Sequence, residues 1–99
     1  MTPEHRASIT WSQQLMDEGL PTVRELTNPA WIDPDAPGDH DGWSLACRFE
    51  RAPSELGNPS AATVRMVAAD APHDRVKAGV TLRLFEPTTK QYASVAIVD

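Results

Sequence analysis

The sequence has one cysteine, few basic residues and no long apolar run, and each shortage excludes a class of protein. A single cysteine, Cys47, cannot form an intrachain disulfide, and no spaced set of cysteines and histidines suggests a zinc site. No stretch approaches the roughly 18 consecutive apolar residues of a membrane-spanning helix. The first residues lead into no apolar leader segment, so we expect a cytoplasmic protein that does not contact membranes.

Nine Lys and Arg residues stand against 14 Asp and Glu residues, and the acidic surplus is confined to one half of the chain. Residues 1–50 carry nine acidic and three basic residues, whereas residues 51–99 carry five acidic and six basic ones. Nucleic-acid-binding proteins need a cationic stripe or patch that faces the phosphates. The basic residues here are scattered singly, so nucleic acid is not the expected partner.

Ninety-nine residues suffice for one small domain, and 40% hydrophobic with 23% charged residues is a globular composition. Within this single domain we expect three parts. They are a helical anchor segment in residues 1–32, an acidic loop in residues 33–42 and a β-barrel core in residues 43–99.

The anchor segment shows two patterns that favour helix. No Pro or Gly interrupts residues 7–18, and apolar residues recur there four apart, which predicts a short helix ended by Gly19. An irregular barrel strand is the alternative for these residues. Residues 21–26 contain a Thr-x-x-Glu capping-box pattern, which predicts one or two helical turns before Pro29. Trp31 then follows as an apolar anchor on the core.

Residues 33–42 contain two Pro, two Gly and four Asp, which is the composition of a turn-rich loop. The loop resembles a calcium-binding loop at Asp33, Asp35 and Gly38, but Pro37 and Ser44 stand where that motif needs ligands. We therefore expect a solvated acidic loop without a metal. Its carboxylates are the first candidate contacts for a partner: Asp33, Asp35, Asp39 and Asp41.

After residue 42 the apolar period changes to two, which is typical of half-buried strands. A loop at residues 51–60, a polar segment with one helical turn at residues 70–77 and a tight turn at Pro87-Thr88-Thr89 separate the strands. These connections are too short for crossover helices, so the strands are expected to pair antiparallel. The expected strands are residues 43–50, 61–69, 80–85 and 90–98. Their expected inner faces are Trp43, Leu45, Cys47, Phe49, Ala62, Val64, Met66, Ala68, Val80, Leu82, Leu84, Ala93, Val95 and Ile97.

The last of these strands is apolar on both faces, so it needs cover on both sides, from barrel closure or from the N-terminal segment. The predicted fold is mainly β: a small, Greek-key-like antiparallel β-barrel with a short N-terminal helical segment.

The order of segments from residue 43 onward resembles the C-terminal β-barrel domain of elongation factor Tu. The resemblance is carried by residues 62–67, the loop 70–79 with its Ala78-Gly79 step, residues 80–86 and the ending Ala96-Ile97-Val98. The chain resembles even more closely short bacterial proteins of unknown function that carry this barrel pattern alone. The resemblance implies a closed barrel of six strands or a similar number, to which the N-terminal segment contributes strands. The chain has no phosphate-binding loop, so GTPase activity does not carry over.

Three residues could in principle carry chemistry. His40 lies between Asp39 and Asp41 and His73 precedes Asp74, so that a carboxylate could orient either imidazole. No nucleophile accompanies them, and both are expected to be surface histidines. Cys47 belongs to the apolar set of its strand, which predicts a core thiol rather than a nucleophile.

Further candidates for partner contact are arginines and tryptophans. Arg48, Arg65 and Arg83 occupy the polar phase of three strands, and would line one sheet face if those strands are neighbours. A solvated charge network and a site for an acidic partner are both open for them. Core packing is the expected role of the tryptophans, with interface contact as the alternative for Trp11, Trp31 and Trp43.

These patterns favour a non-catalytic protein-interaction module, for example an immunity- or antitoxin-type inhibitor whose acidic surface covers a basic cleft. One alternative is a free-standing barrel that contacts the translation machinery. A small hydrolase using His73 or the acidic loop is less favoured, because no nucleophile, base and orienting group can be assembled from the sequence. No cofactor is expected.

Overall fold

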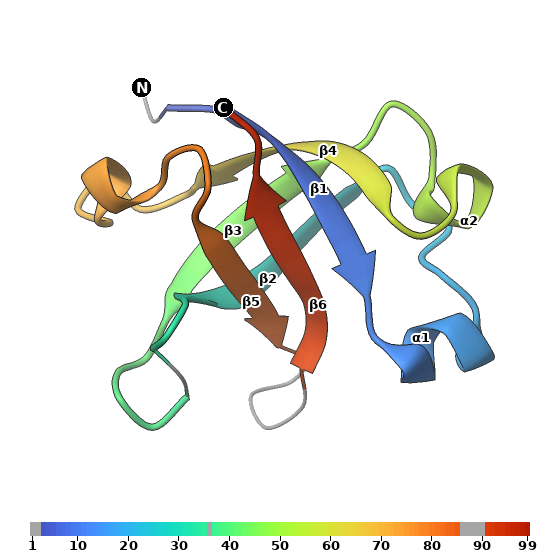
Figure 1. The fold of residues 1–99 in the computed structure, drawn as a ribbon, viewed down its shortest axis with the longest axis horizontal. Helices are drawn as coiled ribbons and strands as arrows, with labels where there is room; N and C mark the ends of the chain where they lie inside the picture. Colours follow the sequence, from blue (N-terminus) through green and yellow to red (C-terminus); the bar gives the residue numbers. More distant parts are fainter. Residues whose placement is uncertain (1–2, 36, 86–90) are drawn as a thin grey trace.

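The computed structural model describes residues 3–35, 37–85 and 91–99 and is built mainly from β-strands (Figure 1). Three short helical segments connect some of the strands. The elements in chain order are β1 (His5–Trp11), α1 (Gln13–Glu18), β2 (Glu25–Ile32), β3 (Trp43–Arg48), α2 (Pro53–Leu56), β4 (Ser60–Met66), the 3₁₀ helix η1 (His73–Arg75), β5 (Thr81–Phe85) and β6 (Gln91–Ile97).

The six strands close into one barrel in the order β1-β4-β3-β2-β5-β6, with β6 returning to β1. Every neighbouring pair is antiparallel. β2, β3 and β4 form a meander, and β1 lies beside β4, which is a Greek-key arrangement. The predicted mainly β class and the antiparallel pairing are confirmed. Because the barrel is closed, each of the six strands pairs with a neighbour on both of its edges.

The N-terminal segment corrects the prediction, because it supplies two of the six strands. Only residues 13–18 of the expected helix are helical, capped by Ser12, and residues 5–11 form β1. Ala7, Ile9 and Trp11 alternate inward and are almost fully buried. The barrel therefore is not confined to residues 43–99.

The predicted helical turns in residues 21–26 are also wrong, since β2 begins at Glu25 and continues through Pro29. β2 pairs with β3 from Glu25 onward but with β5 only from Ala30 onward. Pro29, which has no N–H to donate, lies just before this second ladder and is therefore tolerated in the strand.

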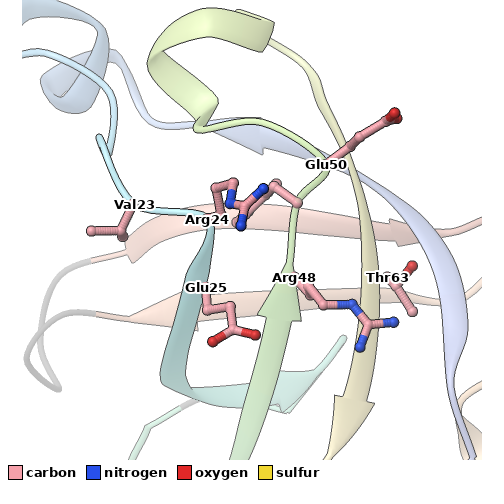
Figure 2. Close-up of a pocket in the computed structure, with 7 residues that line it drawn as sticks. Val23, Arg24, Glu25, Arg48, Glu50 and Thr63 are labelled. Carbon is pink, nitrogen blue, oxygen red and sulfur yellow. The ribbon is translucent and has the colours of Figure 1, made fainter.

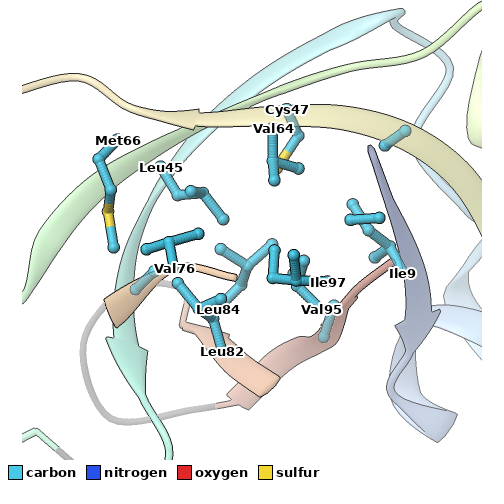
Figure 3. Packing of buried hydrophobic residues seen from close by; sticks show 14 of the residues in the cluster. Ile9, Leu45, Cys47, Val64, Met66, Val76, Leu82, Leu84, Val95 and Ile97 are labelled. Carbon is cyan, nitrogen blue, oxygen red and sulfur yellow. The ribbon is translucent and has the colours of Figure 1, made fainter. Parts of the chain in front are cut away.

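The barrel interior is filled by apolar side chains from all six strands (Figure 3). The residues with no exposed surface include one or more from every strand: Ile9, Ala30, Leu45, Val64, Leu82, Leu84 and Val95. The predicted inward phase of the four C-terminal strands is confirmed at these positions. Trp43, Ala68 and Val80 are exceptions, since they are only half-buried against the core.

The two barrel ends are closed differently. At one end Val76, from the segment between β4 and β5, joins the core, and no strand pattern had marked it. At the other end Trp11 packs edge-on against Tyr92, with ring centroids 5.6 Å apart, and its indole N–H donates to Ser60 Oγ at 2.9 Å. Ser60 is fully buried and donates in turn to the Gly57 carbonyl.

The connections agree in part with the predictions. The loop expected at residues 51–60 contains α2 and ends one residue earlier, because β4 begins at Ser60, and residues 73–75 form the single helical turn expected there. The predicted tight turn at residues 87–89 lies outside the described residues. The acidic loop and η1 lie on one side of the barrel, whereas α1 and α2 lie on the other (Figure 1). In the described part of the chain, no helix is long and apolar enough to cross a membrane.

Candidate functional site

The acidic loop folds back onto the outer wall of the barrel, where it covers Trp31. The indole of Trp31 projects outward from β2, yet only 2% of the residue is exposed. Its N–H donates to the His40 carbonyl at 3.0 Å, and its ring meets Phe85 edge-on at 5.2 Å between centroids. Trp31 therefore anchors the loop to the barrel, in agreement with the predicted anchor role, and it is too buried for the partner contact that was left open as the alternative. Phe85, which is not among the expected inner-face residues of its strand, is buried as well and contacts this indole.

Arg83 fastens the first part of the loop from β5. One of its Nη2 hydrogen bonds goes to the Pro34 carbonyl at 3.2 Å, and another goes to the Asp35 carbonyl. Its Nε lies 3.8 Å from Asp33 Oδ1 and has no hydrogen-bond partner of its own. Arg83 thus acts on the backbone of the acidic loop and is three-quarters buried by it.

The acidic loop carries its own counter-ions. Asp35 Oδ2 lies 3.5 Å from Arg75 Nη1 of η1 and 3.3 Å from His40 Nε2. Together with the Arg83–Asp33 contact, this offsets much of the charge of the first two predicted contact residues. Asp39 and Asp41 lie further along the loop and are exposed. The exposed carboxylates of the second half of the loop are therefore those of Asp39 and Asp41.

The predicted arginine face is divided between two sides of the barrel. Arg48 of β3 and Arg65 of β4 lie on adjacent strands, with Ala46 opposite Arg65 and Arg48 opposite Thr63. β2 separates both of them from Arg83. Both of these arginines are exposed; Arg48 pairs with Glu4 at 3.5 Å, and Arg65 also interacts within the chain.

Beside Arg48 lies a shallow depression of about 780 Å³ (Figure 2). Arg24 and Arg48 border it, with Glu25 and Glu50 as carboxylates of the same rim. A further depression of about 400 Å³ continues across β4 and β1, where the exposed side chains of Leu56 and Val98 line it. Sequence reasoning missed Arg24, because it stands in the irregular stretch before β2 and no periodic pattern marks it.

The remaining candidates have structural roles. His73 Nε2 lies 3.0 Å from the Ala68 carbonyl and ties η1 to the preceding turn. Trp11 is a core residue, so the interface role left open for it does not hold. Trp43 alone of the three tryptophans keeps exposed surface, where it lines a depression of about 520 Å³ with His40, Asp41 and others.

Cys47 is buried in the barrel, and this burial raises the pKa of its thiol from 9.0 to about 12. We expect iodoacetamide at pH 8 to label the folded protein at least about a hundredfold more slowly than the unfolded chain, because the reacting thiolate is both scarcer and covered. Labelling rates with and without denaturant measure this. Equal rates would contradict the burial.

The raised pKa of the Cys47 thiol also makes the folded protein less stable at alkaline pH. The unfolded chain releases the thiol proton at lower pH than the folded protein, so the free energy of unfolding should decrease as the pH rises from 9.0 through about 12. A Cys47→Val variant serves as the control, since it lacks this contribution to the pH dependence.

Among the residues that the structure places, no group of three or more His, Cys, Asp or Glu side chains is arranged to hold a metal ion. Comparison of the chain with models of known protein families, with curated proteins and with solved structures found no match.

Proposed function

We propose that the protein is a non-catalytic interaction module that binds another protein through the acidic loop, as an immunity- or antitoxin-type inhibitor does. The observation that carries the proposal is the anchoring of this loop by Trp31 and Arg83. A loop that is ordered before binding loses little conformational entropy on contact with a partner, and so keeps more of its interaction energy as affinity. Acidic loops that serve only solubility need no such anchoring.

The contact surface is the second half of the loop together with its apolar neighbour. Asp39 and Asp41 supply exposed carboxylates, and the partly buried Trp43 lines one depression together with Asp41 and Pro72. A partly exposed aromatic residue with charged residues around it is a common composition for a protein interface. The partner is therefore a protein with a basic contact surface, and the opposite charges accelerate the encounter at low salt.

The packed interior supports binding rather than catalysis. The described core residues fill the barrel, and the depressions beside Arg48 and Trp43 lie on its outer surface. His40 and His73 are both engaged by the loops that carry them. An enzyme of this size would need a concave site with a matched acid and base.

The experiment is a pull-down and co-expression test against the products of adjacent genes, followed by titration of the partner found. The double variant Asp39→Asn/Asp41→Asn should bind at least about tenfold more weakly, and with a smaller dependence on salt. The matched control is Asp17→Asn/Glu18→Gln, which removes two charges from α1 on the other side of the barrel. Equal affinity of the wild type and the Asp39/Asp41 variant would reject the loop as the contact.

A second form of the same binding function is contact with the translation machinery. The closed six-stranded barrel has the architecture that the resemblance to elongation factor Tu implies. Co-sedimentation with ribosomes or tRNA-bearing fractions at low salt tests this form. Absence from those fractions would reject it while leaving the first form standing.

A further inference from the structure

His40 stands at the centre of the contacts that close the acidic loop. The Gly42 N–H donates to His40 Nδ1 at 2.9 Å, and His40 Nε2 lies 3.3 Å from Asp35 Oδ2. A nitrogen that accepts a hydrogen bond carries a lone pair. The imidazole is therefore neutral in this arrangement, with its proton on Nε2, where it donates to the Asp35 carboxylate.

The same residue closes the cover over Trp31. Its carbonyl accepts the indole N–H, and the imidazole and indole rings lie 6.1 Å apart at an angle of 34°. Gly42 packs so tightly on the indole that a Cβ atom there would lie 2.7 Å from Trp31 Cζ2. Any displacement of residues 40–42 therefore uncovers Trp31.

The charges around His40 come from three elements. Arg75 of η1 shares Asp35 Oδ2 with the imidazole, at 3.5 Å, and Arg83 of β5 binds the Asp35 carbonyl. Asp74 and Lys77 line a neighbouring depression instead. The charged groups next to His40 are Asp35, Asp39 and Asp41 of the loop itself and Arg75 of η1, whereas Asp33 lines the neighbouring depression and contacts Arg83.

We propose that His40 is a proton-sensitive latch that holds the acidic loop closed over Trp31. Protonation of Nδ1 replaces the acceptor of the Gly42 N–H by a second N–H, and the two donors then oppose each other. The imidazolium stays near Asp35 but repels the Arg75 guanidinium that shares its oxygen. Histidine is the side chain whose charge ordinarily changes between pH 5 and 8, so the loop is closed at neutral pH and released in mild acid. This device needs no partner and goes beyond the proposed function.

The test is hydrogen exchange by NMR at the Gly42 amide and at the Trp31 indole N–H, from pH 7.5 to pH 5. Each rate is divided by that of an unprotected group at the same pH. Both protection factors should fall about fivefold or more, the factor that corresponds to one net hydrogen bond. The two groups should lose protection with a common midpoint in this pH range.

Two substitutions of the same residue distinguish the latch from other titrations. His40→Asn places an amide oxygen near the position of Nδ1, so protection should persist at pH 5. His40→Gln has no acceptor there, so protection should be low at both pH values. The control His73→Asn should behave as the wild type.

Constant wild-type protection between pH 7.5 and pH 5 would overturn the proposal. A loss of protection that persists in His40→Asn, or that disappears in His73→Asn, would overturn it as well, because the responding group would then not be His40. Full protection in His40→Gln would show that the Gly42 bond does not hold the loop.

Discussion

Replacement of Gly42 by alanine is expected to lower the free energy of unfolding by about 2–4 kcal/mol. Gly42 has a φ of +78°, a region that side chains with a Cβ rarely adopt. The new Cβ would also lie 2.7 to 2.9 Å from three carbons of the Trp31 ring. The ring cannot move aside freely, since Phe85 packs against it. The loop must therefore lift from Trp31, and chemical denaturation measures the loss.

Gly38 provides the matched control in the same loop. Its φ is +107°, but a Cβ there would meet no atom within 4 Å. Gly38→Ala carries the backbone strain alone, and we expect a loss of about 1 kcal/mol. The difference between the two variants measures the packing of the loop on Trp31. Equal losses would mean that the loop does not close on the indole.

Replacement of Leu84 by alanine should cost about 2–5 kcal/mol, toward the upper end of that range. Leu84 has no exposed surface, and its cross-strand partners on the two sides are Ala30 and Ala93. These small neighbours cannot extend into the space that the leucine leaves, so a cavity remains in the barrel. Domains of about this length have total stabilities of about 5–15 kcal/mol, so the variant would be marginal. Thermal and denaturant unfolding measure the change.

Leu56→Ala is the control for Leu84→Ala. The same side chain is removed there, but Leu56 is 37% exposed on α2 and leaves no enclosed space. We expect a loss of less than about 1 kcal/mol. If the two variants lost similar amounts of stability, the filled interior of the barrel would be in question. Near-UV circular dichroism distinguishes a destabilised native state from a loosened core.

The strands after residue 42 were predictable because each presents one face to the core, so that apolar residues recur at every second position of the sequence. β1 carries the same signal, since Arg6, Ser8 and Thr10 alternate with Ala7, Ile9 and Trp11. The four-residue spacing between Trp11 and Leu15 is typical of a helix, and it led to a helical interpretation of residues that form β1. β2 was less predictable, because Pro29 is normally a sign that a regular element ends.

The candidate site was predictable only as a composition. The four aspartates of residues 33–42 marked an acidic loop, but local sequence did not indicate where it would fold. Trp31 lies on the outward phase of β2, which predicts exposure, and its burial depends on His40 and Gly42 returning over it. Likewise the division of the arginines depends on strand order, which places β2 between Arg83 and the other two.

By itself, the sequence determined the acidic surplus of its first half, the mainly β class, the buried phase of the C-terminal strands and the acidic character of residues 33–42. These properties follow from composition and from local periodicity, because a half-buried strand must alternate and a turn must use residues that allow it. Tertiary structure alone decided that residues 5–11 and 25–32 complete the barrel, and that the acidic loop is fixed over Trp31. Both outcomes depend on contacts between residues distant in the chain, which no local pattern contains.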